Sequence, residues 1–472
     1  MPFTTSNSAS TDRARLLKPG LVLFTILLAL WHLIQGWSPL RLNEDVVHLL
    51  RVAGAVADGA GYVYQGAPTY YPHGYPALIA AFDHAGLGVS WVIFGVNYVF
   101  AGFGLWAVYR IARGPYRLQG WIGTLVVALT LLSYVFVKHV PLPMSDVPFF
   151  GLSTLSIYFL ALANSYPDSR RWLPLVAGTA LAALAIWFRT VGIALAPAVL
   201  WAAFSENSPL TSPLKRIARH RLGAVTLGIA ALVGVVAAVL VIVRTQAKYL
   251  HELATYFDAL NRGEWLETLY ERAQIFGGLF LNLPGSQLPS SLETLLALAG
   301  VVALVVVGYG LWLRRRHFSA VDVYMLTYLG VVTVWPAGDA RFFLPVVPLL
   351  VLWGIGAVRH VIASRASRIW TVILAVYLLG FSLAGMAALA YSTSLTFAGD
   401  TFPARYGSGY FESEYRIAFE GPYPQAASEH ISALEVLVRY EPRTNAYFRA
   451  LPDYPRLSPE LKETLSCAAG KQ

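Results

Sequence analysis

The sequence has little charge and almost no cysteine, and each shortage excludes a class of protein. Only 13% of its 472 residues are charged, whereas 56% are hydrophobic; soluble domains carry about 25% charged residues. The single cysteine, Cys467, excludes any disulfide within the chain. No phosphate-binding glycine loop, Cys-x-x-Cys pair or His-Glu-x-x-His motif occurs. Nucleotide hydrolysis and zinc proteolysis therefore have no signature here.

Long apolar runs recur along most of the chain. Continuous apolar runs of about 18 residues or more, without period-two alternation, are typical of membrane-spanning α-helices and not of a β-barrel. We predict about eleven spans, at 20–37, 88–109, 119–137, 144–164, 172–187, 190–204, 222–243, 291–313, 320–335, 343–358 and 369–391. The expected fold class is an all-α polytopic membrane protein.

Basic residues predict which side of the membrane each loop occupies. Lys and Arg gather before the first predicted span and after the second, fourth, sixth, eighth and tenth, whereas the alternate loops hold few. Cytoplasmic loops carry such an excess. We therefore expect an integral inner (plasma) membrane protein with a cytoplasmic amino terminus, a retained first span and an external, periplasmic carboxyl tail. Because the net charge of +9 follows this loop pattern, nucleic acid is not an expected partner.

Three regions are expected outside the membrane on the external face. They are a first loop at 38–87, a second loop at 244–290 and a small tail region at 392–472, which leaves 1–391 as the transmembrane domain. In the first loop, an apolar stripe over 46–56 predicts an amphipathic helix lying at the membrane interface, with Asp45 at its amino-terminal end. The second loop is also expected to form an amphipathic interfacial helix. The active site should lie among these external regions.

Four short motifs occur in a fixed order. They are Asp45 with Tyr71-Pro72-His73-Gly74-Tyr75-Pro76, then Met144-Ser145-Asp146-Val147-Pro148, Arg189-Thr190-Val191-Gly192 and Arg341-Phe342-Phe343-Leu344-Pro345. This ordered set resembles the GT-C glycosyltransferases, the superfamily of protein O-mannosyltransferases and lipid A aminoarabinose transferases. The resemblance covers most of the chain up to about residue 355.

The resemblance implies a membrane glycosyltransferase. Such an enzyme transfers a sugar from a polyprenyl-phosphate donor to an acceptor glycan, lipid or protein, with an acidic residue early in the first external loop as catalytic base. Asp45 occupies that place, and Glu44, which directly precedes it, stays open as the alternative. His73 stands where the family usually has a proline.

The same residues suit the chemistry. A hydroxyl that attacks the anomeric carbon needs a general base, a task for which a carboxylate is suited, and a single displacement predicts inversion. The leaving phosphate is stabilised best by a guanidinium. Arg341 is the first candidate and Arg189 the second, with Lys138 and His139 as a third option. Arg341 could instead pair with Asp339, and a charge between apolar runs, such as Arg189, could simply be paired.

The remaining candidates are contacts to substrate or metal. Asp146 could bind the acceptor or a metal, or be only a first-turn acid after its cap residue. Tyr71, His73 and Tyr75 are candidate substrate contacts. A divalent metal held by Asp45 and Asp146, with Glu44, would suit oxygen-ligand chemistry, but these ligands are too few to predict one. The donor lipid is the only other small molecule implied.

Two other functions stay open. A secondary transporter or lipid flippase also needs about a dozen helices and buried charges, but such folds usually show internal repeats with broken helices at the midplane. The sequence shows no repeat relating its halves. An undecaprenyl-linked glycan ligase or polymerase would be expected to carry a large external loop rich in Arg and His near the later spans, and the loop at 244–290 holds few.

Overall fold

The computed structural model describes residues 8–164, 171–204, 265–285, 288–333, 335, 338–365, 368–397, 435–437 and 439–441. The predicted span 222–243, about half of the predicted loop 244–290 and most of the predicted tail 392–472 lie outside these residues. The division of the chain at residue 391 therefore stays a prediction.

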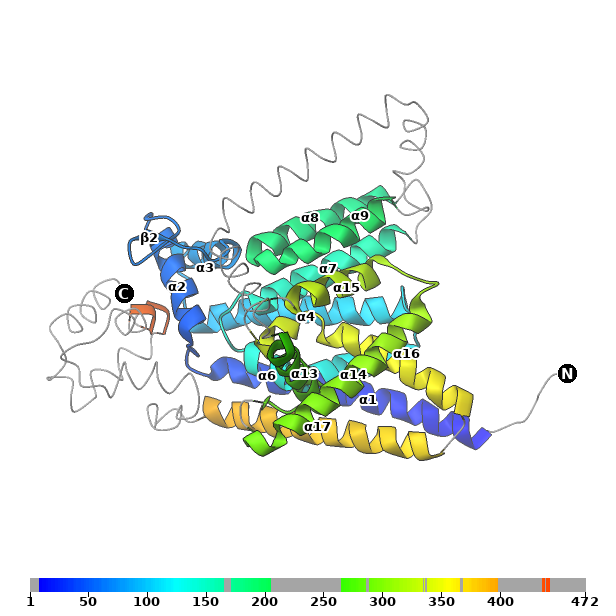
Figure 1. Cartoon of the computed structure of the whole chain (residues 1–472). Helices are drawn as coiled ribbons and strands as arrows, with labels where there is room; N and C mark the ends of the chain where they lie inside the picture. Colours follow the sequence, from blue (N-terminus) through cyan, green and yellow to red (C-terminus); the bar gives the residue numbers. More distant parts are fainter. Residues whose placement is uncertain are drawn as a thin grey trace, which may run out of the picture.

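The described part is almost entirely helical (Figure 1). In chain order its elements are α1 (Ser8–Ile34), η1 (Gln35–Trp37), α2 (Glu44–Ala57), β1 (Val63–Tyr64), β2 (Ala67–Pro68), α3 (Gly74–His84), α4 (Ser90–Arg113), α5 (Gly120–Leu132), α6 (Tyr134–His139), α7 (Asp146–Ala163), α8 (Trp172–Phe188), η2 (Thr190–Leu195), α9 (Ala196–Phe204), α13 (Trp265–Leu281), η5 (Ser290–Leu292), α14 (Glu293–Arg314), α15 (Ala320–Thr333), η6 (Ala340–Phe343), α16 (Val347–Arg365) and α17 (Arg368–Thr396). The described strands form one antiparallel hairpin, in which Val63 pairs with Pro68 and Tyr64 with Ala67. The predicted all-α class is confirmed.

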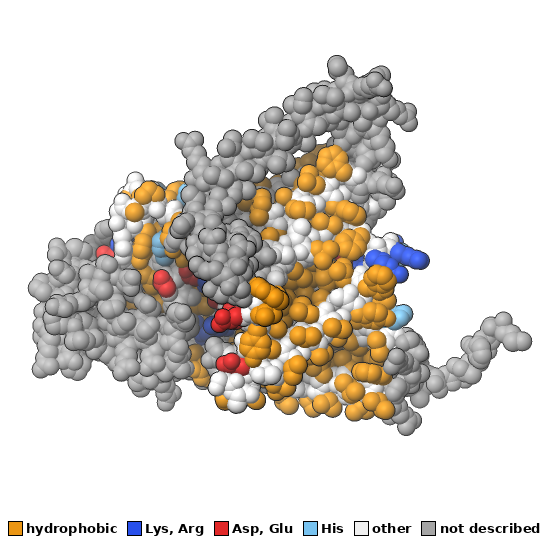
Figure 2. All heavy atoms as spheres, viewed as in Figure 1, with side chains coloured by type: hydrophobic (Ala, Val, Ile, Leu, Met, Phe, Trp, Pro, Cys, Tyr) orange, Lys and Arg blue, Asp and Glu red, His pale blue; other side chains and the backbone are white. Residues whose placement is uncertain are grey.

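Five described helices are long and apolar enough to cross a membrane. They are Lys18–Trp37, Ser90–Arg113, Asp146–Ala163, Ser290–Arg314 and Ile369–Thr396. Shorter apolar helices occupy the other predicted spans that the structure describes, and a membrane crossing needs about 20 residues. Hydrophobic side chains are spread over much of the described surface in the view of Figure 2. The chain is an integral membrane protein, whereas the count of about eleven spans stays a prediction.

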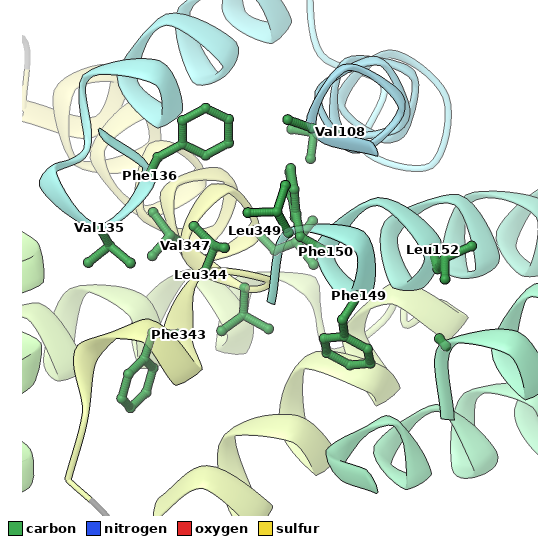
Figure 3. Close-up of a cluster of buried hydrophobic side chains, with 14 of the residues drawn as sticks. Val108, Val135, Phe136, Phe149, Phe150, Leu152, Phe343, Leu344, Val347 and Leu349 are labelled. Carbon is green, nitrogen blue, oxygen red and sulfur yellow. The ribbon is translucent and has the colours of Figure 1, made fainter. Parts of the chain in front are cut away.

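Helix α7 lies at the centre of the bundle. In its apolar window 83% of the residues are buried, and it packs on α4, α8 and α15. The approach to α4 is close, because a Cβ added at Gly151 would lie 2.5 Å from the carbonyl oxygen of Phe100; small residues allow such contacts between membrane helices. Figure 3 shows Phe149 and Phe150 of α7 in one cluster with Phe343. This packing fixes the position of the first turn of α7.

The predicted span 119–137 is not one helix. Helix α5 ends at Leu132 and α6 begins at Tyr134, with Ser133 extended between them. The Asn282 side chain occupies the break: it accepts a hydrogen bond from the Tyr134 amide (2.7 Å) and donates one to the Leu132 carbonyl (2.9 Å). A broken helix is tolerated within a bundle when its free backbone groups find such partners. The sequence pattern carried no signal of this residue, which follows the distant helix α13.

Helices α2 and α3 lie at one end of the bundle, called here the α2 end (Figure 1). Asn43 caps α2, because its side chain accepts a hydrogen bond from the Val46 amide (2.8 Å). This places Asp45 in the first turn, as predicted. The apolar stripe of α2 is buried by protein, including α3. The sequence predicted that this stripe faces a membrane surface; the structure covers it instead with neighbouring elements.

Candidate active site

Asp45 lies between two hydrogen-bond donors from distant parts of the chain. The Tyr71 hydroxyl donates to its Oδ1 and the Arg341 guanidinium to its Oδ2. Tyr71 precedes α3, and Arg341 lies in η6. The Asp45 side chain is 21% exposed, so it is reachable from a cavity while its orientation is held from both sides.

The surroundings of Asp45 keep it ionised at neutral pH. Burial alone would raise its pKa, but the Arg341 charge and the hydrogen bond from Tyr71 outweigh this and hold the pKa below its ordinary value of 3.8. Burial and the Asp45 charge raise the pKa of the Tyr71 hydroxyl well above its ordinary value. Tyr71 therefore remains a donor, and Asp45 remains an acceptor able to take a proton.

Arg341 has two acidic neighbours. The Asp339 side chain accepts from the Arg341 backbone amide (2.9 Å) and caps η6, and its Oδ2 lies 3.1 Å from the Arg341 Nε. The pairing of Arg341 with Asp339 that the sequence left open is thus present, and the same guanidinium also reaches Asp45. Burial alone would lower the pKa of Arg341, but Asp146, Asp45 and Asp339 together raise it.

A second ion pair joins Asp146 with Arg189. Asp146 begins α7 and is 1% exposed, and Arg189 follows the last residue of α8, where the backbone becomes extended. One carboxylate oxygen of Asp146 bonds to Arg189, whereas Oδ2 is buried without a hydrogen-bond partner among the described residues. A buried acceptor in this state is unfavourable, so Asp146 retains capacity for one more hydrogen bond.

Both ion pairs line one cavity of about 220 Å³. Its walls are Asp45, Leu49, Tyr70, Tyr71, Pro72, Met144, Ser145, Asp146, Arg189, Thr190, Val191, Val332, Trp335, Arg341 and Phe342. The guanidinium carbons of Arg189 and Arg341 each lie 5.2 Å from the centre of the Phe342 ring, within cation–π range. Residues from all four motifs, which are far apart in the sequence, therefore meet at the α2 end of the bundle.

The aromatic walls of the cavity were missed from the sequence. Tyr70, Trp335 and Phe342 line it, yet the sequence assigned no role to any of the three, although Phe342 lies within the Arg341 motif. The missed signal was adjacency, since Tyr70 precedes Tyr71 and Phe342 follows Arg341. The loop that carries Tyr70 and Tyr71 is supported by His48 of α2, whose ring centre lies 4.4 Å from that of Tyr71.

Three other predicted site residues do not line the cavity. Glu44 is exposed at the start of α2 and is absent from the cavity wall. Lys138 is exposed, and the buried His139 donates from Nδ1 to the Val135 carbonyl (2.7 Å). Their positions at the end of α6 direct neither residue into this cavity.

The two remaining candidates of the first loop also lie elsewhere. His73 is exposed and stacks on Tyr62, with ring centres 4.0 Å apart. Tyr75 is fully buried in α3, and its hydroxyl has no hydrogen-bond partner among the described residues. In the described part of the chain, no group of three His, Cys, Asp or Glu side chains is arranged to hold a metal.

A second cavity, of about 330 Å³, is an apolar groove between helices. Residues of α5, α13, α14, α16 and α17 line it. Along α16 it extends from Val347 to Ile362, about 22 Å of helix. At one end, Phe276 of the groove wall packs on Phe343, with ring centres 4.8 Å apart, and Phe343 follows Phe342 of the charged cavity. The apolar groove thus begins beside the charged cavity.

No protein-family model and no curated protein matches this sequence. Among solved structures, the chain is similar to ArnT from Cupriavidus metallidurans bound to undecaprenyl phosphate, with 17% identity and a TM-score of 0.42 over 96% of this chain and 75% of that chain. The apo state of the same ArnT gives 18% identity and a TM-score of 0.44 over the same shares. The archaeal oligosaccharyltransferase AglB from Archaeoglobus fulgidus, in complex with an inhibitory peptide and a dolichol-phosphate, gives 11% identity and 0.40 over 85% of this chain and 58% of that chain.

Proposed function

We propose that this protein is an inverting membrane glycosyltransferase that moves one sugar from a polyprenyl-phosphate carrier to an acceptor outside the cytoplasm. The observation that carries the proposal is the cavity itself, which the Asp45–Arg341 and Asp146–Arg189 ion pairs both line. These residues belong to the motifs that resemble the GT-C glycosyltransferases. A base, two phosphate-binding cations and a further acceptor oxygen are the groups that this transfer needs.

Asp45 acts as the general base. Each oxygen of its carboxylate accepts one hydrogen bond in the structure, and each has a second lone pair free for an acceptor hydroxyl. As that hydroxyl attacks, its proton passes to Asp45, a bond forms between its oxygen and the anomeric carbon, and the bond from that carbon to the phosphate oxygen breaks. Glu44 is the weaker choice because it is exposed outside the cavity.

Arg341 and Arg189 stabilise the leaving phosphate. The electron pair of the breaking bond goes to the phosphate oxygen, where negative charge accumulates, and a fixed guanidinium lowers the energy of that state. Each arginine is held by a carboxylate and by the Phe342 ring, which limits its movement. Asp146 Oδ2 remains available for a sugar hydroxyl or amine.

The apolar groove suits the carrier lipid. A polyprenyl chain needs a long apolar surface that starts near the phosphate, and the groove along α16 begins two residues after Pro345 of the Arg341 motif. Its lining is almost wholly aliphatic and aromatic up to Arg359. The carrier would thus place its phosphate beside Arg341 and its chain between helices.

The cavity belongs on the external face. Described basic residues gather at the end of the bundle opposite α2: Arg110 and Arg113 end α4, and Arg314 ends α14. Figure 2 shows Lys and Arg side chains grouped there on the visible face. Because cytoplasmic segments carry such charges, this end is the cytoplasmic one, and the acceptor arrives from outside.

The test is mass spectrometry of polyprenyl-phosphate lipids from cells that lack this protein, complemented with wild type, Asp45→Asn or the matched control Glu44→Gln. We expect a polyprenyl-phosphate sugar to accumulate in the deletion and to clear with wild type and Glu44→Gln, but to persist with Asp45→Asn. Its mass identifies the sugar. If no such lipid changes while a solute gradient or the sidedness of a lipid does, the transporter or flippase replaces this proposal. If undecaprenyl-linked glycans change only in length or ligation, the polymerase or ligase replaces it.

A further inference from the structure

A short segment of the carboxyl tail is buried against α2 and α3. Val436 is 1% exposed, and Leu437 and Tyr440 are fully buried. They belong to the hydrophobic core cluster that also includes Leu50 and Ala53 of α2. Figure 1 places this segment beside α2, far along the chain from it. We call residues 435–441 the tail clamp, of which the structure describes all but one.

Arg439 of the tail clamp joins the ends of α2 and α3. Its two terminal nitrogens donate to the two Asp58 oxygens (2.7 and 3.0 Å), and its Nε donates to Asp83 Oδ2 (2.6 Å). Asp58 caps the end of α2, and Asp83 lies in the last turn of α3. The Tyr440 hydroxyl also donates to Asp83 (3.2 Å). Paired guanidinium–carboxylate bonds of this kind fix geometry as well as contribute energy.

The tail clamp also holds the chain before α2. The Leu40 amide donates to Glu441 Oε2 (3.0 Å), and Glu441 is fully buried. Within α2, Arg51 forms an ion pair with Glu435. The clamp therefore contacts the segment before α2, the middle of that helix and its end.

Gly54 leaves the space that Arg439 occupies. A Cβ at this position would lie 3.2 Å from Nη1 of Arg439 and 3.4 Å from its Cδ. The arginine side chain thus packs on α2 at Gly54, and its guanidinium group reaches Asp58 and Asp83. A larger residue at position 54 would displace it.

We propose that the tail clamp positions the catalytic base. Asp45 lies in the first turn of α2, and Tyr71, its hydrogen-bond donor, lies on the loop between α2 and α3. Holding both helices at their carboxyl ends fixes this loop and the direction of the first turn of α2. Arg439 is a positioning residue in this scheme and touches no substrate. The inference rests on the proposed function, since it assigns the clamp a role in the same reaction.

The test combines amide hydrogen exchange with turnover on full-length protein in nanodiscs. Variants are Arg439→Ala, Asp83→Asn and both together, and the control is Arg315→Ala, which removes an exposed cation stacked on Trp312. We expect faster exchange over residues 44–57 but not over 90–113 of α4 in the clamp variants. With the polyprenyl-phosphate sugar that deletion cells accumulate, kcat should fall about tenfold with little change in KM, because misplacement of a catalytic group lowers the rate of the chemical step.

Comparison of the single and double variants distinguishes a specific role of the tail clamp from general destabilisation. The double variant should lose no more of its kcat than Arg439→Ala alone, since removing Arg439 already removes the one contact that Asp83→Asn weakens. The inference is overturned if exchange over 44–57 is unchanged, if exchange rises while kcat stays at the wild-type value, or if the losses add fully. Should wild type transfer no sugar at all, the proposed function fails, and the exchange data alone still decide whether the clamp holds α2.

Discussion

Two clusters of opposite charges lie near the two ends of α15. The cavity cluster consists of Asp45, Tyr71, Asp146, Arg189 and Arg341, and Val332, near the end of α15, lines the same cavity. The sealed cluster consists of Tyr116, Arg314, Ser319, Asp322 and Trp353, around the first turn of α15. From Asp322 to Val332 the helix extends about 15 Å. Both clusters pair aspartate with arginine and include a tyrosine hydroxyl.

Their hydrogen bonding differs. In the sealed cluster, Asp322 is fully buried and accepts from Nε and Nη2 of Arg314 (2.8 and 3.0 Å) as well as from Ser319 and Tyr116. In the cavity cluster, an oxygen of Asp146 has no partner in the described part of the chain. A saturated network rigidifies a bundle, and an incomplete one around a cavity is suited to a ligand. The same residue types therefore form a saturated network at one end and, at the other, an incomplete one at the cavity that we propose as the active site.

The largest expected effect is loss of turnover in Asp45→Asn. Removing a general base lowers the rate by about 100- to 10,000-fold. Because Asp45 is half-buried and asparagine has the same shape, the substitution should leave the fold intact. Turnover and thermal unfolding of the purified variant measure the two quantities. Glu44→Gln is the control and should stay within about twofold, as surface changes do. Full activity in Asp45→Asn with loss in Glu44→Gln would reverse the assignment of the base.

Asp322→Ala should show the opposite pattern. It leaves the partly buried Arg314 charge without its fully buried partner, and breaking a buried pair destabilises by about 3–5 kcal/mol. We expect a lower thermal midpoint and a lower yield, with wild-type turnover per folded molecule. Asp45→Asn serves as the matched comparison. If Asp322→Ala lost turnover without losing stability, the distinction between the two clusters would be wrong.

Arg341→Lys should reduce turnover by a smaller factor. Lysine keeps the positive charge but lacks the planar set of donors that lets arginine reach Asp45 and a phosphate together. One charge-assisted hydrogen bond is worth about 1.5–3 kcal/mol, or about 10- to 150-fold in rate. Steady-state kinetics with the donor lipid measure the loss. Arg315→Lys, at the opposite end of the bundle, should have no effect. Equal losses in the two variants would point to membrane anchoring and not to phosphate binding.

The smallest effect is a shift of the pH profile. Because Asp45 has a pKa below 3.8 in the folded protein, its ion pair contributes stability above that value, and both this contribution and activity are lost only as pH falls through the lowered pKa. In Arg341→Gln the main lowering charge is gone and burial remains, so the pKa rises and the acid limb moves to higher pH. The pH dependence of kcat/KM measures this shift. An unmoved acid limb would show that Asp45 is not the titrating group.

Much of the cavity could be predicted from single residues and their order. Asp45, Asp146, Arg189 and Arg341 are charges next to apolar spans, where an unpaired charge is costly, and the structure brings all four to one cavity. The positions of the tyrosines were harder to predict. Tyr71 lies in the cavity and Tyr75 does not, because Tyr75 lies within α3 and is buried in the protein core, whereas Tyr71 precedes that helix. Spacing along a loop does not reveal which side chain turns inward.

Charge alone did not reveal how Lys138 and His139 lie in α6. Both end an apolar run, as Arg189 does, and α6 contacts η6, but neither residue lines the cavity: Lys138 is exposed, and the buried His139 donates to the Val135 carbonyl. The break between α5 and α6 depends on Asn282, which reaches Leu132 and Phe381 from a distant part of the chain. A local apolar pattern cannot contain a hydrogen bond made across the bundle.

Composition and the continuity of apolar runs are sufficient to establish an all-α membrane protein, because a bilayer requires each helix to satisfy its own backbone. Local patterns are likewise sufficient for the capped first turn that carries Asp45. The partners of that carboxylate are a different matter. Arg341 stands 296 residues away and Arg439 of the tail clamp 381 residues from Asp58, and no local rule couples such positions. Their meeting is decided by helix packing, since side chains so distant in sequence become neighbours only when the bundle is formed.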